Sequence, residues 1–347
     1  MKENTEVTIY DIAKKLNLAT STISRGLKDH HSISKKTIQK IKKTAEEMGY
    51  SPNNLAASLR GNKMKTIGVL IPTVTQPFLS SLISGIEITA QKAGYTVVIM
   101  QSHDSYKEEV NLTKSLYNNR VSGVICSLAM ETKDTAHFKI FTDNNTPLVF
   151  VDRVPKHFET FHVVIDNFSA GYKATKHLID QGCKRIAHIT AGYEYSIFYE
   201  RKNGYIQALK DHGLPVLEEL IVKVDEITYD EAEKVSKKLL NLKNPPDGIF
   251  APGDILGVSA LQFAKKRGIK VPEDLAIIGF NNDPISLIID PSLSTISHPA
   301  SKMGQASAEI ILKYLKASKK NDEIEKQITF LNTEVLARES SNKKQIK

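Results

Sequence analysis

The chain has 347 residues, enough for two or three domains, and only two cysteines, which excludes a small disulfide-stabilised fold. It contains no run of eighteen apolar residues and its N-terminus is polar, so we expect a cytoplasmic protein with neither a membrane-spanning helix nor a secretion signal. Residues 1–65 contain 13 Lys and Arg against 6 Asp and Glu, whereas residues 66–347 contain 34 against 33.

This basic N-terminal segment predicts a head that binds a polyanion. Neutralising phosphates releases condensed counterions and so favours association with nucleic acid. A membrane surface is the alternative partner, but it would require a basic amphipathic helix with large apolar anchors or a lipidation signal. Residues 1–65 contain neither, which favours nucleic acid.

Three short helices are predicted within the head. Thr8 and Asp11 have the spacing of a capping box and indicate the start of the first helix. The second is expected over Thr20 to Leu27, and the third begins after Ser34 and ends at Gly49. Apolar residues fall on one face of each helix, namely Ile12, Ala13, Leu16, Ile23, Leu27, Ile38, Ile41, Ala45 and Met48. Two short helices joined by a tight turn, with a third that closes the core, are typical of a helix-turn-helix.

The second helix carries the polar residues that such a head would present to DNA. Thr20, Ser21 and Arg25 lie opposite Ile23 and Leu27 on a helical projection. Their side chains are therefore expected to be exposed and able to reach base edges in the major groove, where arginine can contact guanine bidentately. A docking module of three helices without DNA contacts is the alternative interpretation.

Residues 8–13 (TIYDIA) and 21–25 (STISR) resemble the head of the lactose-repressor/galactose-repressor (LacI/GalR) family, and the similarity extends to about residue 340. The resemblance implies base contacts by Thr20, Ser21 and Arg25, and phosphate contacts by Tyr10, Ser24, Ser34 and Tyr50. The family usually has a serine cap where this chain has Ala19. If Thr20 caps the helix instead, the helix begins one residue later and Thr20 is less available to read a base.

Residues 51–61 predict a hinge helix, with Asn53 at its N-cap and Gly61 just past its end. A helix this short is marginal in water, so we expect it to fold when two copies pack together on DNA. The family resemblance implies that Leu59 inserts into a base step of the minor groove, with Ala56 beside it. The alternative is an ordinary linker helix in which Leu59 is packed inside.

From Thr66 onward, apolar strand-like runs alternate with amphipathic segments, which predicts parallel sheets wound with helices on both faces. One series comprises residues 67–71, 97–100, 124–127 and 148–151, and a second comprises 186–189, 220–224, 249–251 and 275–279. These two series predict two doubly wound lobes.

Ligands of such folds lie beyond the carboxyl ends of the strands, where this chain has many carboxylates and amides. Such groups suit a hydroxyl-rich ligand such as a sugar. The resemblance implies the periplasmic-binding-protein-like sugar-binding fold and an effector site formed by Phe78, Asp152, Asp166, Arg201, Asp254, Asn282 and His298. For each of these residues, a loop-end cap or a surface group is the alternative.

The chain departs from the family at several of these places. The family commonly has an aromatic near Ile227, Asn where Gly253 stands, and Asp or Gln where Asn281 and His298 stand. Ile227 cannot stack on a sugar ring as an aromatic residue would. The alternative effectors are therefore a phosphorylated sugar, an oligosaccharide and a purine.

We therefore predict an all-α helix-turn-helix head and an α/β sensor of two doubly wound parallel-sheet lobes. The expected boundaries are 1–50 for the head, 51–61 for the hinge, 62–165 with 299–322 for the first lobe, 166–298 with 323–340 for the second, and 341–347 for a polar tail.

The predicted function is sequence-specific DNA binding by a homodimeric transcription repressor on a pseudo-palindromic operator, controlled by a small effector, with either induction or corepression open. An enzyme is the first alternative, but the chain lacks G-x-G-x-x-G, G-x-x-x-x-G-K-[ST] and G-x-S-x-G. We expect no catalytic residue, metal, cofactor or membrane partner. A solute-binding protein without a regulatory role is the second alternative, and it would have no use for a basic head.

Overall fold

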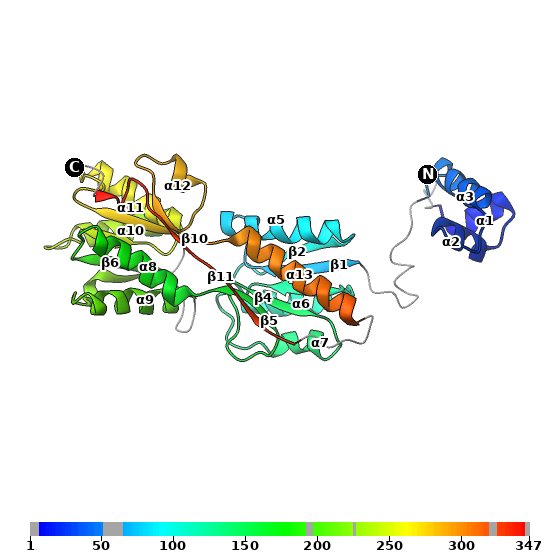
Figure 1. Ribbon diagram of the computed structural model, residues 1–347, viewed down its shortest axis with the longest axis horizontal. Coiled ribbons are helices and arrows are strands. Elements are labelled where there is room, and N and C mark those ends of the chain that lie inside the picture. The colour runs from blue at the N-terminus through cyan, green and yellow to red at the C-terminus, as the bar shows by residue number, and fades with distance from the viewer. Residues whose placement is uncertain (1–6, 51–64, 192–196, 225–226, 319–324, 344–347) are drawn as a thin grey trace. The chain divides into compact units, whose positions relative to one another are not determined.

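The computed structural model describes residues 7–50, 65–191, 197–224, 227–318 and 325–343. These residues form two compact units, one before residue 65 and one from residue 65 onward (Figure 1). The predicted hinge at 51–61, with Asn53, Ala56 and Leu59, lies outside the described residues.

The first unit is a bundle of three helices, α1 (Ile9–Leu16), α2 (Thr20–Leu27) and α3 (Lys35–Glu47). The capping box that begins α1 is present, because the backbone N–H of Thr8 donates to Oδ2 of Asp11 at 2.8 Å. Fully buried Ile12, Ile23 and Ile41, one from each helix, form the core of the bundle. The head is therefore helical, as predicted.

The first lobe of the second unit contains a parallel sheet of six strands in the order β11-β5-β4-β3-β1-β2. The strands are β1 (Thr66–Ile71), β2 (Thr96–Gln101), β3 (Gly123–Cys126), β4 (Leu148–Val151), β5 (Phe161–Ile165) and β11 (Ile328–Leu331). Its helices are α5 (Pro77–Lys92), α6 (Tyr106–Asn118), a 3-10 turn (Ala136–Phe138), α7 (Lys139–Thr142) and α13 (Ala300–Ser318).

The second lobe contains six strands in the order β12-β10-β9-β8-β6-β7, all parallel except for the short β12. The strands are β6 (Ile186–Ala191), β7 (Ile221–Val224), β8 (Gly248–Phe250), β9 (Ala276–Asn281), β10 (Ser294–Ser297) and β12 (Val335–Leu336). The helical segments are α8 (Asn167–Asp180), α9 (Ile197–Asp211), a 3-10 turn (Glu218–Leu220), α10 (Tyr229–Leu240), α11 (Asp254–Lys266) and α12 (Ile285–Ile288).

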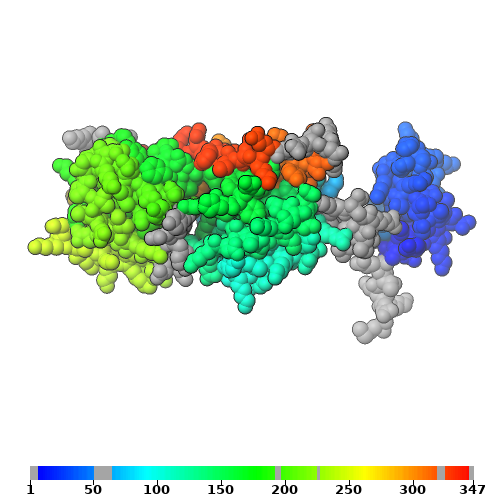
Figure 2. Space-filling view, turned by 90° about the horizontal axis from the view of Figure 1, so that it is seen from below, coloured from blue at the N-terminus to red at the C-terminus, as the bar shows by residue number. Residues whose placement is uncertain are grey.

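Residues 323–340 were predicted to belong entirely to the second lobe, and this is wrong for the stretch around β11. Ile328 pairs with His162 of β5 in the first sheet, and the backbone N–H of His162 donates to the carbonyl of Gln327 at 3.2 Å. The outer edge of β5 would otherwise leave backbone donors and acceptors unpaired, and β11 satisfies them. The chain thus returns to the second lobe only after Leu331, and its C-terminal residues, coloured red, lie across both lobes (Figure 2).

Glycines allow two pairs of helices to approach very closely. Along α5 and α13, which run side by side in Figure 1, a Cβ at Gly304 would lie 2.1 Å from the carbonyl oxygen of Leu82. Along α8 and α9, a Cβ at Gly204 would lie 2.1 Å from the carbonyl oxygen of Phe168. Real atoms cannot approach so closely, so any larger residue must push these backbones apart.

We expect Gly304→Ala to lower the free energy of unfolding by about 1–3 kcal/mol, because the added methyl group meets backbone that cannot rotate away. Gly257→Ala in α11 is the matched control, since its new Cβ would meet the tip of the Leu293 side chain at 2.9 Å. Thermal unfolding of the full chain measures both changes. Equal shifts in melting temperature would contradict the backbone-contact explanation.

Candidate functional site

The head presents a polar face of α2 opposite its buried face. Ser21 and Arg25 are exposed, and Thr20 and Ser24 are half-buried, whereas Ile23 and Gly26 point into the core. The side chain of Arg25 makes no hydrogen bond with the rest of the described chain, so its guanidinium donors are available. The structure therefore brings these four predicted DNA-contact residues onto one short helix.

The cap of α2 lies at Ala19, which makes no side-chain hydrogen bond, and Thr20 is the first residue of the helix. The alternative in which Thr20 caps the helix is therefore wrong. Ala19 has the extended backbone conformation of an N-cap residue although its side chain makes no capping hydrogen bond. The helix therefore begins after position 19, where the family usually has its serine cap. The Thr20 side chain is not used as a cap.

The residues predicted to contact phosphates lie elsewhere in the head. Tyr10 on α1 is 67% exposed. Ser34 caps α3, and its Oγ accepts a hydrogen bond from the backbone N–H of Thr37 at 3.2 Å. Tyr50 is half-buried against the core, and this burial raises the pKa of its hydroxyl group. Its ring packs against the bundle, while the phenol stays protonated and able to donate.

In the second unit, four of the predicted effector residues come together near the point where the lobes meet. The rings of Phe78 and His298 stack with their centroids 4.0 Å apart. Nε2 of His298 lies 3.6 Å from Oδ1 of Asp152, which follows β4. Arg201 of α9 is close enough to influence the pKa values of both Asp152 and His298. We call Phe78, Asp152, Arg201 and His298 the inner cluster.

Arg201 is buried, with only 2% of its surface exposed, and several contacts hold its guanidinium in place. Its Nε donates to Oδ1 of Asn167 at 2.9 Å, and its Nη1 donates to the carbonyl of Pro252 at 3.2 Å. The guanidinium also lies 3.5 Å from the centroid of the Phe280 ring. Burial lowers the pKa of Arg201 to about 9, so the group remains charged at neutral pH.

Two buried polar atoms of the inner cluster have unused hydrogen-bonding capacity. Among the described residues, neither Oδ1 of Asp152 nor Nε2 of His298 has a hydrogen-bond partner. Burial raises the pKa of Asp152, against the opposing charges of Arg153 and Arg201, and burial lowers the pKa of His298 well below its ordinary value. Asp152 also has a left-handed backbone with φ of 62°. Unpaired buried groups on a strained backbone are typical of a ligand-binding site.

The other three predicted effector residues already have structural partners. Oδ1 of Asp166 caps α8 by accepting the N–H of Ser169 at 2.8 Å. Asp254 accepts the N–H of Asp283 at 2.6 Å and the hydroxyl of Thr295 at 2.7 Å. Oδ1 of Asn282 accepts a hydrogen bond from Nη2 of Arg338 at 2.6 Å. Their oxygen atoms stabilise strand ends and a helix start.

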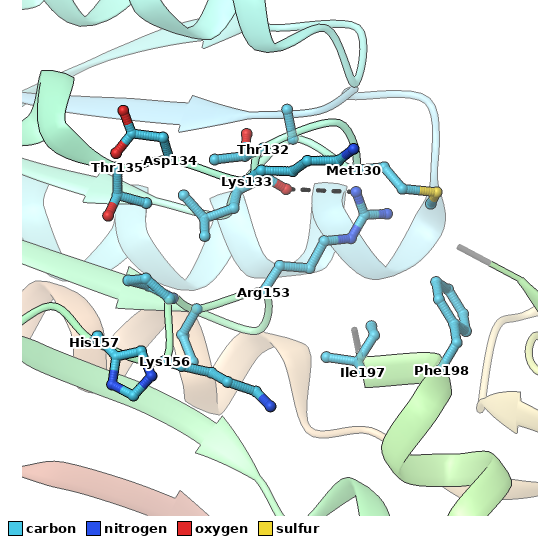
Figure 3. A pocket seen from close by; sticks show the side chains of 14 residues that line it. Met130, Thr132, Lys133, Asp134, Thr135, Arg153, Lys156, His157, Ile197 and Phe198 are labelled. Carbon is cyan, nitrogen blue, oxygen red and sulfur yellow. Dashed lines mark hydrogen bonds between the residues drawn. The ribbon is translucent and has the colours of Figure 1, made fainter. Parts of the chain in front are cut away.

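The body also contains a cavity of about 770 Å³, and Figure 3 shows the side chains that line it. Two first-lobe loops, which follow β3 and β4, and the start of α9 line it with Leu128, Ala129, Met130, Thr132, Lys133, Asp134, Thr135, Arg153, Val154, Pro155, Lys156, His157, Ile197 and Phe198. None of the seven predicted effector residues is in this lining. The inner cluster nevertheless adjoins it, because Arg153 follows Asp152 and the ring of Phe198 lies 5.5 Å from the Arg201 guanidinium.

The sequence analysis missed the loop after β3, although that loop follows a predicted strand. It is organised by Glu109, a fully buried carboxylate on α6. Oε2 of Glu109 accepts the N–H of Ala129 at 2.7 Å, and its Oε1 accepts the hydroxyl of Thr132 at 2.8 Å. His137 lies 3.1 Å from the same Oε1. The helical spacing of Glu109 from Thr113 and Leu116, which places all three on the inner face of α6, was the available signal.

Within the described residues, no helix is both long and apolar enough to cross a membrane.

Comparison with protein-family models matches residues 8–53 to "Bacterial regulatory proteins, lacI family" and residues 175–341 to a "Periplasmic binding protein-like domain". Among curated relatives, the transcriptional repressor CytR of Escherichia coli K12 is 32% identical over 311 residues, which are 90% of each chain. Catabolite control protein A of Priestia megaterium is 31% identical over 310 residues, covering 89% of this chain and 92% of that protein.

Solved structures show the same architecture. The transcriptional regulator CelR in complex with cellobiose matches with a TM-score of 0.72 and 25% identity, covering 96% of this chain and 100% of that one. The Lac repressor dimer bound to operator and the anti-inducer ONPF matches with a TM-score of 0.86 and 21% identity, covering 97% and 99% of the two chains. The predicted fold class, a helical head with a two-lobed parallel-sheet body, is confirmed.

The buried carboxylate of Asp254 predicts a pH-dependent stability difference. Burial raises its pKa to about 7, above the value near 4 expected in the unfolded chain. The folded state therefore binds this proton more tightly, and the stabilisation present at low pH is lost as the pH rises through about 7. Asn at this position can accept from the Asp283 N–H and donate to the Thr295 hydroxyl, yet it does not ionise.

We expect the stability of Asp254→Asn, relative to the unmodified chain, to increase between pH 5 and pH 8. Thermal unfolding of both proteins at several pH values in this range gives the difference. Asn111→Ala, at an exposed position on α6, removes no ionisable group and is the control, expected to give a difference that does not change with pH. A constant difference for Asp254→Asn would show that this carboxylate does not titrate there.

Proposed function

The chain belongs to the lacI family of bacterial regulatory proteins, and on that premise we propose that its head binds operator DNA as half of a homodimer while its body binds the controlling effector. As a member of this family, it is a DNA-binding transcription repressor that responds to a small molecule. The observation that carries the proposal is the exposed face of α2, which presents Ser21 and Arg25 above a buried Ile23.

In the head, α2 acts as the recognition helix in the major groove. Arg25, Ser21 and Thr20 are assigned to base edges, where a bidentate arginine discriminates guanine from other bases. Tyr10, Ser24, Ser34 and Tyr50 are assigned to phosphates, which orient the head without reading sequence. In the hinge, Asn53, Ala56 and Leu59 are assigned to the minor groove on sequence grounds. Half-sites about one helical turn apart require two heads, which supports a homodimer on a pseudo-palindromic operator.

In the body, the inner cluster is proposed to bind a sugar or a sugar derivative. The stacked rings of Phe78 and His298 offer an apolar surface, and the unpaired atoms of Asp152 and His298 offer acceptors or donors for hydroxyl groups. A purine would use the same ring surface and is the alternative. Asp166, Asp254 and Asn282 are assigned a supporting role, because each already holds a strand end or a helix start.

We propose that the body binds this ligand without converting it and that the protein acts in the cytoplasm, where operator DNA is found. The relatives named above are transcription regulators, which supports binding over catalysis. A solute-binding protein without a regulatory role would not need the head at residues 8–53.

The effector controls DNA binding by favouring one arrangement of the two lobes. The chain passes between the lobes three times, between β5 and α8, between β10 and α13, and between β11 and β12. Such connections permit hinge motion around a ligand, and the shift is limited by the difference in the effector's affinity for the two arrangements. Tighter binding to the arrangement that cannot engage DNA gives induction, and the reverse gives corepression.

The proposal is tested by selecting duplexes from a random pool with the full chain. We expect a two-fold symmetric sequence to be enriched. Arg25→Ala should lower affinity for that sequence by about 10- to 100-fold and relax selection at one base of each half-site, because one bidentate contact is lost.

Arg267→Ala removes an exposed arginine from the second lobe and is the matched control, expected to leave operator affinity unchanged. Binding should be measured at a stated salt concentration, since phosphate contacts alone weaken steeply with salt. Enrichment of no sequence over random competitor would overturn the proposed function.

A further inference from the structure

The cavity beside the inner cluster has a cationic wall. Lys133 of the loop after β3, and Arg153 and Lys156 of the loop after β4, contribute three basic side chains, and His157 adds a titratable ring. Asp134 is the single carboxylate in the lining, which consists wholly of described residues. In Figure 3 the Asp134 carboxylate lies at the end of the pocket away from Ile197 and Phe198, while Lys156 and Arg153 extend toward them.

The nearby carboxylates are engaged in holding the loops. Oδ1 of Asp134 accepts a hydrogen bond at 3.0 Å from the backbone N–H of Ala136, the first residue of the 3-10 turn. Oδ1 of Asp104, outside the lining, accepts the N–H of Met130 at 2.9 Å and pairs with Nη1 of Arg153. Both carboxylates therefore link segments of the wall as well as partly balancing its charge.

Arg153 is positioned by these contacts but is not saturated by them. Its Nη1 donates to Asp104 and lies 3.5 Å from the carbonyl of Leu128. Its Nη2 and Nε make no hydrogen bond with the described part of the chain, so part of the guanidinium fork remains available. A guanidinium held on one side and open on the other matches the planar geometry of a carboxylate or phosphate.

Lys133 belongs to the loop after β3, whose conformation is stabilised by hydrogen bonds to a buried carboxylate. Its neighbour Thr132 donates to the buried carboxylate of Glu109 at 2.8 Å, and Ala129 of the same loop donates to Glu109 at 2.7 Å. These bonds hold the loop at both sides of Met130, so the basic residue extends from a rigid segment. Like charges gathered on a concave wall focus a positive potential and attract an anion.

The other lining residues suit the uncharged part of a small organic ligand. Ile197, Phe198 and Val154 are apolar, and the hydroxyls of Thr132 and Thr135 add hydrogen-bonding groups. Because Phe198 borders both the cavity and Arg201, a ligand that contacts the inner cluster can extend into this cavity.

We propose that the effector carries an anionic group, a phosphate or a carboxylate, and that Lys133, Arg153 and Lys156 bind it in this cavity. This inference rests on the proposed function, since it assumes that the body is the effector-binding part. It narrows the ligand from a neutral sugar or purine to a charged derivative. Within the body, the inner cluster binds the uncharged part of the ligand and the cationic wall binds its charge.

The test uses the full chain and matched probes that differ only in charge. Glucose, ribose and N-acetylglucosamine are compared with their phosphate esters and with the corresponding sugar acids, and inorganic phosphate is included, by thermal shift and by calorimetry. We expect at least one phosphorylated or acidic probe to bind at least tenfold more tightly than its neutral partner. This preference should weaken as the salt concentration rises.

The Lys133→Gln/Lys156→Gln double variant removes two charges while keeping side-chain length, and should lose at least tenfold in affinity for the charged probe but little for the neutral partner. Lys114→Gln, at an exposed position on α6 of the same lobe, is the control and should bind the probe as the unmodified chain does. Preference for the ester over the acid identifies a phosphate ligand, and the opposite preference identifies a carboxylate. Either result supports the proposal.

The proposal is overturned if no charged probe binds more tightly than its neutral partner, or if the double variant binds the charged probe as well as the control variant does. Sequence-specific DNA binding is measured on the same preparations. If DNA binding is intact while the charged probes fail, only the anionic-ligand proposal is wrong. If sequence-specific DNA binding is absent, the proposed function itself is wrong.

Discussion

The burial of one cation, Arg201, determines how the centre of the two-lobed body is arranged. Removing a guanidinium from water costs several kcal/mol unless hydrogen bonds and neighbouring charge compensate. The compensation comes from separate parts of the chain, because Asn167 begins α8, the Pro252 carbonyl follows β8, and Phe280 belongs to β9. Asp152, which follows a first-lobe strand, adds the opposing charge. A single buried side chain thus couples both lobes to the site where the ligand is proposed to bind.

The same constraint separates the residues that hold the fold from those that are open to a ligand. Asp254 and Asn282 have partners within the second lobe, because both carboxylate oxygens of Asp254 and Oδ1 of Asn282 accept hydrogen bonds there. Asp152 and His298 are buried, as Asp254 is, but leave Oδ1 and Nε2 without hydrogen-bond partners among the described residues. Buried polar atoms are nearly always paired in folded proteins. Because these two atoms lie side by side in the inner cluster, they offer hydrogen-bonding groups to a molecule bound there.

Local signals in the sequence were sufficient for the head and for most strands, because caps and hydrophobic periodicity are read from neighbouring residues. The capping box of Thr8 and the helix from Thr20 to Leu27 are examples. Pairing of β11 with β5 depends on residues 166 positions apart, which no local pattern reveals. Asp152 was named through the family resemblance, and it directly follows the predicted strand at 148–151. The cationic wall could not be predicted, because Lys133 becomes part of it only through the loop conformation that Glu109 stabilises.

The return of the chain to the first lobe has a consequence for synthesis on the ribosome. The first five strands of that sheet are complete at Ile165, but α13 and β11, which cover and extend them, are not made until residues 300–331. At about 5–20 residues per second, translation of the intervening second lobe takes roughly ten to thirty seconds. During that interval the nascent first lobe exposes the apolar surface that Met303 and Ile311 later bury, and the free edge of β5. The emerging polypeptide is therefore a natural client for chaperones that shield hydrophobic segments until translation ends.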